Sequence, residues 1–260
     1  MRRGSSRLAP AVAARALLSP FGIGISKRIA LVGSGNSITA LLVKESIPAG
    51  TPLLLAPDAA LLTCQGALDA DVDGLVPPPA EMLEMLKRDT AHLDHVYVAH
   101  FLSLQFFTDK GSWFAGQIHH FKDSGSTSKK DAAGSRVWER FAREYVTAPA
   151  PVFLAALQYV WESCFRKTAT EAACLPPAPL PAALAVAPVV DVAVRSRNTT
   201  NSTLTATTAK VVRETYLNGD ITGARQALLA KNDAYAYWVL TANTDIPVGS
   251  EVSVSPQPSL

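Results

Sequence analysis

Short runs of apolar residues, bounded by glycine, proline or polar residues, follow one another near the start of the chain. Ala30–Val32 precedes the turn cluster Gly33–Asn36, and two further apolar runs follow at Ile38–Val43 and Pro52–Ala56. Apolar runs of this length between turn residues are typical of buried strands. The pattern predicts a hairpin whose turn lies at Ile47-Pro48-Ala49-Gly50, where proline presets φ and glycine can supply a positive φ.

A second copy of this pattern closes the chain. The apolar run Trp238–Ala242 is followed by Ile246-Pro247-Val248-Gly249 and by the alternating stretch Glu251–Val254. The pattern predicts a second hairpin over 236–254, about 200 residues after the first. Two explanations remain open. Either the hairpins belong to one sheet system and are alike by coincidence, or together they are a family signature.

The middle of the chain changes to helical spacing. Apolar residues recur every three or four positions in Glu81–Phe107, which predicts a long helix that begins just after a proline. Pro151–Thr168 predicts a second apolar helix, and Arg136–Tyr145 predicts a short charged one. The remaining stretches are rich in Asp, Pro, Gly, Ser or Lys and are predicted to lack helices: Gln65–Pro79 as a linker, Lys122–Ser135 as an exposed loop and Leu175–Pro181 as a proline-rich segment.

The composition is that of a globular protein. With 260 residues and 48% hydrophobic content, the chain can form one large domain or two small ones. Cys64, Cys164 and Cys174 form no C-x-x-C pair and predict neither a zinc site nor a disulfide framework. No apolar run approaches the roughly 20 residues of a membrane span. The sequence also contains no P-loop, GxSxG elbow or Rossmann fingerprint.

Several histidines lie in or near the predicted helices. His92, His95 and His100 fall on the first long helix, but a metal site needs more ligands that face the same way. Surface or half-buried histidines are therefore the preferred interpretation. The pair His119-His120 is predicted to lie in a solvated turn.

Positive charge is concentrated at the start of the chain. All charged residues before Glu45 are basic: Arg2, Arg3, Arg7, Arg15, Lys27, Arg28 and Lys44. Because the whole chain carries +2 and these seven residues carry +7, the rest of it carries −5. An arginine-rich start without acidic residues is typical of a mitochondrial transit segment, and a disordered basic tail is the alternative. If the arm is retained, RNA phosphates would suit it.

The two Ile-Pro-x-Gly segments resemble the SET domain, and within it the branch similar to the Rubisco large-subunit and actin-histidine methyltransferases. That branch opens with G-x-G before a D-I-P-x-G segment, closes with D-I-P-x-G-E-E before S-Y-G, and carries a helical insert between them. Lys110–Phe114 resembles its Lys-Ser-Phe-Trp-like corner, and Pro188–Asp191 resembles its Pro-Leu-Leu-Asp segment. The resemblance covers about Ala30 to Ser255.

The resemblance implies an α+β fold, namely a β-rich SET-like domain interrupted by a helical insert. We expect a basic arm or transit segment at 1–28, the N-terminal part of the SET-like domain at 29–75, the insert at 76–180 and the C-terminal part at 181–260. SET domains thread their C-terminal segment through a preceding loop, so the topology tests this assignment. An unrelated α+β binding module is the competing hypothesis.

The positions that hold S-adenosylmethionine in this family are changed. Ile38 and Ala40 replace the glycines of G-x-G, which allow close backbone approach to the cofactor. Val194-Arg195 replaces the Asn-His pair, and Ser163-Cys164-Phe165 lacks the arginine of the Ser-Arg-hydrophobic element. Pro256, which has no hydroxyl and no N–H, replaces the catalytic tyrosine.

A register shift onto Gly33-Ser34-Gly35 would restore the G-x-G, but it needs five extra residues before the strand. Because only four residues follow Pro256, we also expect the C-terminal substrate-binding domain of the branch to be absent. We therefore expect no catalytic, cofactor-binding or metal-binding residues and no cofactor. Framework positions persist, and a fold can outlive its chemistry because the core and the site make separate demands on the sequence.

These changes predict a catalytically inactive SET-like protein that serves as a structural or assembly component of a complex in the mitochondrial matrix. The first expected partner is the mitochondrial ribosome or its assembly intermediates, with protein subunits contacting the body and RNA contacting the basic arm. The alternative is an active S-adenosylmethionine-dependent lysine or histidine methyltransferase with a diverged pocket.

Overall fold

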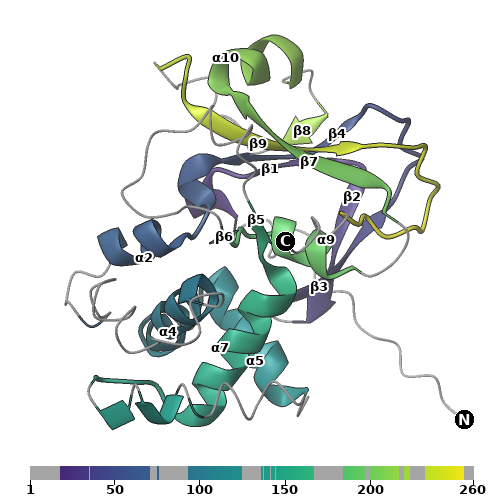
Figure 1. The fold of residues 1–260 in the computed structure, drawn as a ribbon. Helices are drawn as coiled ribbons and strands as arrows, with labels where there is room; N and C mark the ends of the chain where they lie inside the picture. The colour runs from purple at the N-terminus through teal and green to yellow at the C-terminus, as the bar shows by residue number, and fades with distance from the viewer. Residues whose placement is uncertain are drawn as a thin grey trace, which may run out of the picture. The chain divides into compact units, whose positions relative to one another are not determined.

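The computed structural model describes residues 18–34, 36–70, 75, 93–124, 136, 138–140, 142–143, 145–166, 184–196, 200–216, 220–222 and 232–254. The chain divides into two compact units, one formed by Met1–Ala60 with Pro188–Pro256 and the other by Leu61–Ala187 with Gln257–Leu260. Both helices and strands are present (Figure 1), so the predicted mixture of the two is confirmed. Among the described residues, no helix is long and apolar enough to cross a membrane.

A five-stranded antiparallel sheet is the frame of the first unit. Its strand order is β7-β9-β4-β1-β8. The bounds are Gly24–Ser26 for β1, Pro52–Pro57 for β4, Ser202–Thr208 for β7, Ile221–Thr222 for β8 and Ala236–Ala242 for β9. Every residue of β4 and all but one of β9 are buried. The continuous apolar runs in the sequence therefore form interior strands, as their lack of polar alternation predicts.

A separate two-stranded sheet joins β2, Ile29–Ser34, to β3, Ser37–Val43. Only residues 35–36 connect the strands, so the turn falls within the predicted cluster. The register shifts between Val32 and Gly33. A Cβ atom at Gly33 would lie 1.9 Å from the carbonyl oxygen of Ser37, so this close approach of the strands requires glycine.

The two predicted hairpins over 38–57 and 236–254 are wrong as hairpins. β3 pairs with β2, whereas β4 pairs with β1 and β9. The Ile-Pro-x-Gly segments do not fold back on their own strands but pair with each other. Ile47 and Ile246 form an antiparallel bridge in which each N–H donates to the other carbonyl, at 3.0 and 2.8 Å.

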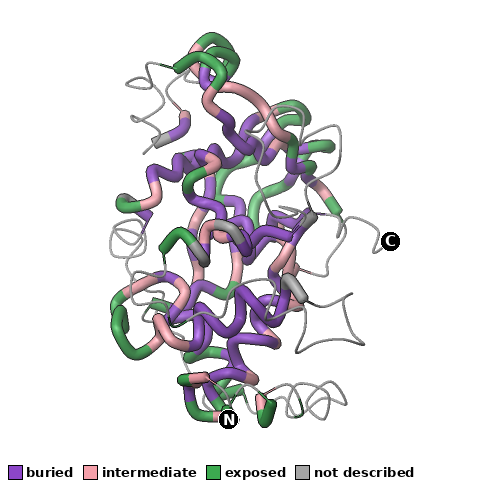
Figure 2. The backbone as a smooth tube through the Cα atoms, turned by 60° about the vertical axis from the view of Figure 1, so that its left-hand side comes forward, coloured by how far each residue is buried: buried purple, intermediate pink, exposed green. Residues whose placement is uncertain are grey.

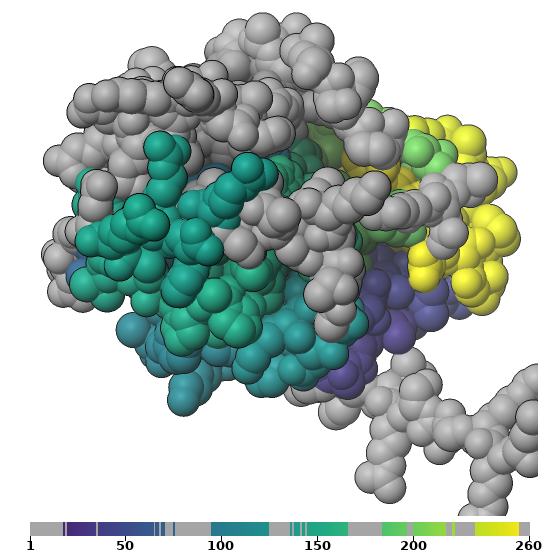
Figure 3. Space-filling model, turned by 60° about the horizontal axis from the view of Figure 1, so that its bottom comes forward, coloured from purple at the N-terminus to yellow at the C-terminus, as the bar shows by residue number. Residues whose placement is uncertain are grey.

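The bonds around this bridge repeat with an approximate two-fold relation. The Gly50 N–H donates to the Ala242 carbonyl at 2.8 Å, and the Gly249 N–H donates to the Val43 carbonyl at 2.8 Å. Both glycines have positive φ angles, 78° and 82°, which L-residues rarely adopt. Figure 3 shows the C-terminal segment (yellow) beside the N-terminal strands (purple), which this pairing joins. The likeness of the two segments is therefore structural, because they occupy equivalent positions in one paired element.

The second unit is built mainly from helices. Their bounds are Cys64–Ala70 for α2, Leu93–Thr108 for α4, Trp113–Asp123 for α5 and Ala150–Ser163 for α7, and the short strands β5, Phe165–Arg166, and β6, Leu184–Ala185, pair with each other. Large side chains at or below 2% exposure fill the core of this unit, among them Tyr97, Trp113, Phe153 and Tyr159. Figure 2 shows such buried residues (purple) in helices as well as in strands.

The N-terminus of α5 explains the aromatic corner that the sequence indicated. The Ser112 hydroxyl accepts a hydrogen bond from the Ala115 N–H at 3.2 Å and so caps the helix, which stabilises a helix by about 1 kcal/mol. Trp113 directly follows this cap and is completely buried. The corner thus begins a helix and anchors it in the core.

Several predicted boundaries in this unit change. The linker predicted at Gln65–Pro79 is wrong over α2, because residues 65–70 are helical and Asp69 lies at the exposed end of that helix. The helix predicted over Pro151–Thr168 ends earlier, at Ser163, since Cys164 takes an extended backbone conformation. His119 and His120 are exposed as expected but lie in a helix rather than a turn.

Other predictions fall wholly or partly outside the described residues. The helix predicted over Glu81–Phe107 is described only from Leu93, and it ends at Thr108. Short helical stretches at 136, 138–140 and 142–143 agree with the predicted charged helix. The proline-rich segment Leu175–Pro181 and most of the exposed loop, 125–135, lie outside the described residues.

The remaining short elements belong to the first unit. They are η1, Ser19–Phe21; η2, Asp58–Ala60; α9, Val190–Arg195; α10, Ala209–Val211; and the π-helical turn η4, Val212–Tyr216. The range 1–28 that was assigned to a basic arm includes β1, which pairs with both β4 and β8. Residues 24–26 therefore belong to the sheet, and residues 1–17 lie outside the described part.

Candidate functional site

The positions that the sequence singled out for cofactor binding meet where β3 lies beside α9 in the first unit. α9 begins after Val189, which is buried and has a φ of 71° and a ψ of −44°. A β-branched residue in this region is a genuine outlier and costs roughly 1–3 kcal/mol. The Val189 carbonyl accepts hydrogen bonds from the N–H groups of Val192 and Ala193, at 3.1 and 3.3 Å. These bonds help to hold the strained residue and set where α9 starts.

Asp191 is a fully buried carboxylate in the first turn of α9. Its Oδ1 atom accepts a hydrogen bond from the Val192 N–H at 2.8 Å. A buried carboxylate needs hydrogen bonds or a counter-ion, because its transfer out of water is otherwise costly. Asp191 has both, since its Oδ2 atom lies 3.8 Å from Nη2 of Arg195.

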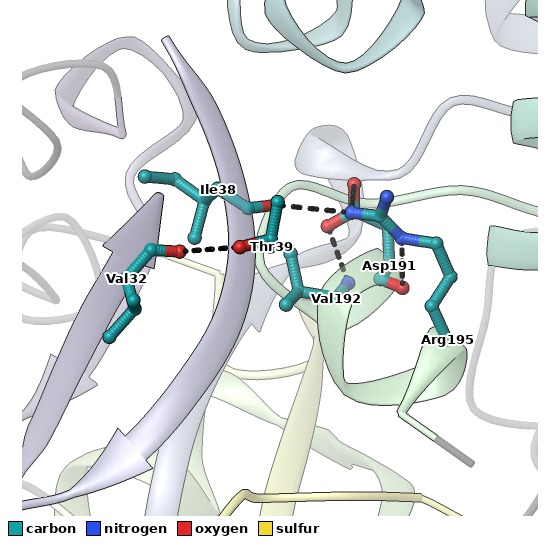
Figure 4. A network of polar contacts seen from close by, with 6 residues as sticks. All are labelled: Val32, Ile38, Thr39, Asp191, Val192 and Arg195. Carbon is teal, nitrogen blue, oxygen red and sulfur yellow. Dashed lines mark hydrogen bonds and ion pairs between the residues drawn. The ribbon is translucent and has the colours of Figure 1, made fainter. Parts of the chain in front are cut away.

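Arg195 connects the end of α9 to β3. Its Nη2 atom donates to the Ile38 carbonyl at 3.3 Å, and its Nε atom donates to the Asp191 carbonyl at 3.3 Å. Figure 4 shows the guanidinium lying between the Asp191 carboxylate and the backbone of β3. The Arg195 side chain is 12% exposed and that of Asp191 is 0% exposed. We call Ile38, Asp191 and Arg195 the arginine clamp.

The chemistry of the clamp is that of a structural contact. A guanidinium has donors but no acceptor and stays protonated in proteins, so it cannot act as a general base. The nearby Thr39 hydroxyl donates to the Val32 carbonyl at 3.3 Å, which ties it to the neighbouring strand. These bonds hold β3 against β2 and α9. The Asp191 carboxylate is the group of the clamp that could accept a proton, and its side chain is 0% exposed and lies against Arg195.

Gly33, onto which a register shift would place the G-x-G motif, has a structural role of its own. Gly33 makes its close backbone approach to Ser37 of the same chain, at the end of the β2–β3 pair. The glycine is therefore required by the strand pair itself. Its presence carries no independent indication of a bound cofactor.

The C-terminal segment 251–254 bonds to β3 and to α9, the two elements that the clamp joins. The Val252 N–H donates to the Leu41 carbonyl of β3 at 2.9 Å, and the Val254 N–H donates to the Ala193 carbonyl of α9 at 3.1 Å. The Ser196 hydroxyl, just after α9, donates to Oε2 of Glu251 at 2.9 Å. The segment thus makes hydrogen bonds to elements that are far from it in the sequence.

The predicted site residues are brought together only in part. The structure joins Ile38 and Arg195 through the clamp, while Ala40 and Val194 are half-buried next to them in the sequence. Ser163-Cys164-Phe165 lies in the second unit. Pro256 lies outside the described residues.

Two features were missed in the sequence. The Asp191–Arg195 pair has the i, i+4 spacing that lets oppositely charged side chains meet on a helix, which is a usable signal. The contact between His95 and Cys164, with Nε2 and Sγ 3.4 Å apart, has no such signal because 69 residues separate the partners. No group of three or more His, Cys, Asp or Glu residues that could hold a metal occurs among the described residues.

One ionisable group outside the clamp is perturbed by burial. Desolvation raises the pKa of the Tyr237 hydroxyl above its usual value near 10, and the neighbouring Tyr235 adds to the increase. Arg213 opposes both effects, since its positive charge favours the phenolate. The rings of Tyr235 and Tyr237 meet edge to face, with centroids 5.6 Å apart. This cluster stabilises the neutral form of Tyr237.

Comparison with known proteins finds likeness in structure but none in sequence. No protein-family model and no curated protein matches the sequence. Among solved structures, a match is the crystal structure of the SET domain of LSMT bound to lysine and AdoHcy, at 12% identity and a TM-score of 0.49. The match covers 96% of this chain, which spans about half, 54%, of the matched chain.

Proposed function

We propose that this chain is a SET-like scaffold that does not transfer methyl groups and serves as a structural or assembly component of a mitochondrial complex. The single observation that carries the proposal is the hydrogen bond from Arg195 to the Ile38 carbonyl. By the sequence resemblance, Ile38 takes the place of a glycine that approaches the cofactor, and Arg195 takes the place of a histidine that helps to bind it. The two changed positions bond to each other.

The clamp opposes cofactor binding in two ways. Ile38 is completely buried, and its carbonyl is engaged by the guanidinium. A cofactor that needs backbone approach at this position has to displace that hydrogen bond and accommodate the isoleucine side chain. If the guanidinium moves aside to make room, Asp191, a fully buried carboxylate, also loses its counter-ion. Breaking a buried ion pair on one side costs about 3–5 kcal/mol, which is a large fraction of a typical binding free energy.

The SET-like assignment itself rests on the sequence motifs and is supported by the pairing of the C-terminal segment. The resemblance implies that this segment passes through a preceding loop, which would bring it against elements far from it in the sequence. Hydrogen bonds from Val252 to Leu41 and from Val254 to Ala193 are in keeping with it.

Isothermal titration calorimetry tests the loss of methyl transfer directly. Purified full-length protein is titrated with S-adenosylmethionine and with S-adenosylhomocysteine, and an active SET methyltransferase is titrated in parallel. We expect no heat of binding from this chain at concentrations at which the active enzyme saturates. A dissociation constant in the micromolar range, roughly −8 kcal/mol, would overturn the proposal and favour an active methyltransferase.

The partner is tested by sedimentation of mitochondrial extracts. Arg2, Arg3, Arg7 and Arg15 are replaced by alanine, and import is supplied by a separate cleavable presequence so that lost targeting is not mistaken for lost binding. A matched control replaces four exposed lysines outside the arm, namely Lys44, Lys110, Lys122 and Lys210.

We expect the wild type and the control to sediment with a large particle at low salt. The arm variant should dissociate at lower salt, because each neutralised phosphate adds to the salt dependence of binding. Migration of the wild-type protein as a free monomer would refute the assembly role.

A further inference from the structure

A thiol and an imidazole meet in the second unit, where α7 ends close to α4. Cys164 is the C-cap residue of α7, and its Sγ atom lies 3.4 Å from Nε2 of His95. His95 is 7% exposed, and its ring lies against that of Trp161 with centroids 6.0 Å apart. Cys164 itself is half-buried, whereas Cys64 is buried. The cysteine is therefore partly exposed to solvent as a residue, while its histidine partner is buried.

This arrangement favours nucleophilic chemistry at sulfur. The thiolate is the reactive form of cysteine, and a neighbouring histidine promotes it by accepting the thiol proton. The contact of 3.4 Å places the accepting nitrogen within hydrogen-bond distance of sulfur. Burial restricts the His95 ring, so the imidazole stays within hydrogen-bond distance of the thiol.

The residue before Cys164 carries a buried polar group of its own. The Ser163 side chain, immediately before Cys164, is completely buried, and its hydroxyl makes no hydrogen bond within the part of the chain that the structure describes. Such a group costs about 1–3 kcal/mol unless it finds a partner.

We propose that Cys164 is a modification site for hydrogen peroxide, with His95 as the group that moves the proton. His95 accepts the thiol proton on Nε2, and the thiolate attacks one peroxide oxygen. The S–O bond forms as the O–O bond breaks, and the leaving hydroxide takes the proton back from His95 to give water. Sulfur is oxidised to a sulfenic acid and peroxide is reduced to water, so no other reactant is needed.

The three cysteines can be followed separately in one experiment. Trypsin cleaves after Arg143 and Arg166, which places Cys164 in a different peptide from Cys64 and Cys174. Full-length protein is treated with hydrogen peroxide in the presence of dimedone, which traps sulfenic acids. The rate of adduct formation is then measured at each cysteine by mass spectrometry between pH 5 and 9.

We expect Cys164 to react at least about tenfold faster than Cys64 at pH 7. His95→Gln should lower the Cys164 rate by about tenfold and move its pH midpoint upward, because the amide cannot accept the proton. Ser163→Ala serves as a matched variant that keeps the proton acceptor and the pH midpoint. Equal rates for Cys164 in the wild type and in a folded His95→Gln variant would overturn the proposal.

If His95→Gln does not fold, the native and urea-unfolded wild-type chains decide the question. Cys164 should react faster at pH 7 in the native protein than in the unfolded one, although it is less accessible there. A slower native reaction would mean that the structure protects the thiol, and it would equally overturn the proposal.

Discussion

Replacing Arg195 by methionine tests the arginine clamp most directly. Methionine keeps much of the length and apolar volume of the side chain but removes the charge and the donors. The change takes the counter-ion from the Asp191 carboxylate, which is 0% exposed, and removes the donor to the Ile38 carbonyl. We expect the free energy of unfolding to fall by about 2–4 kcal/mol, somewhat less than for an ideal buried pair because 3.8 Å is a long ionic contact.

Arg28 provides a matched control. It also bonds one carboxylate and one carbonyl, with Nη2 3.5 Å from Oδ2 of Asp220 and Nη1 3.1 Å from the Ser46 oxygen. The difference is burial, since the side chains of Arg28 and Asp220 are 31% and 46% exposed. Water screens this pair, so Arg28→Met should cost less than about 1 kcal/mol.

Asp191→Asn completes a double-mutant cycle with Arg195→Met. The amide oxygen can still accept the hydrogen bond from the Val192 N–H, so mainly the charge is removed. The two changes together should cost less than the sum of the single changes by about 1–3 kcal/mol, because the second removes the charge whose counter-ion the first took away.

The free energy of unfolding of each protein is measured by urea unfolding followed by circular dichroism. Amide hydrogen exchange then shows which segments each substitution destabilises. In Arg195→Met, the peptides that cover 37–43 and 190–196 should lose protection first, since these segments are what the clamp joins. A variant that stays within about 0.5 kcal/mol of the wild type, or that loses no more than Arg28→Met, would refute the structural role of the clamp.

Three further measurements test other parts of the structure. Ser163→Ala should raise the free energy of unfolding by about 1 kcal/mol in urea unfolding, because it removes a buried hydroxyl that makes no hydrogen bond to the described residues; a loss of stability would contradict this. Folding raises the pKa of the Tyr237 hydroxyl. Its contribution to the stability of the folded state is therefore complete below the unfolded pKa near 10, and it is lost as the pH rises through the folded pKa. Tyr237→Phe should therefore flatten the alkaline fall in melting temperature, and an unchanged slope would count against it. Gly33→Ala should cost at least about 2 kcal/mol, since its Cβ would lie 1.9 Å from a backbone oxygen. Gly66→Ala is the control in α2, where the added Cβ would lie no closer than 3.5 Å to another atom, and it should stabilise the protein by about 0.5–1 kcal/mol. Equal effects of the two substitutions would contradict the close approach of β2 and β3 at Gly33.

The sequence was most informative about features that depend on one segment alone, namely its burial and its type of secondary structure. The runs that became β4 and β9 are apolar at almost every position, and both are buried. The apolar helix predicted from Pro151 differs from α7, Ala150–Ser163, mainly at its C-terminal end. Burial and local periodicity depend on neighbouring side chains, so they can be predicted without knowledge of the fold.

Pairing between distant segments was beyond such patterns. Ile47 and Ile246 are about 200 residues apart, yet they share two backbone hydrogen bonds. Every residue other than proline carries the same backbone donor and acceptor, so an apolar run specifies that it is buried but not which strand it joins. For this reason the sequence predicted two separate hairpins, whereas in the structure the two Ile-Pro-x-Gly segments pair with each other.

The candidate site divides in the same way. The sequence by itself determined the apolar runs in which Ile38 and Arg195 lie, and through the resemblance it predicted that Ile38 takes the place of a glycine and Arg195 that of a histidine. Only the tertiary structure decided that these two residues bond to each other, 157 positions apart, beside a buried Asp191. The identity of a side chain sets which hydrogen bonds it can make, whereas its partner depends on how the strained start of α9 and the β2–β3 pair bring two distant segments together.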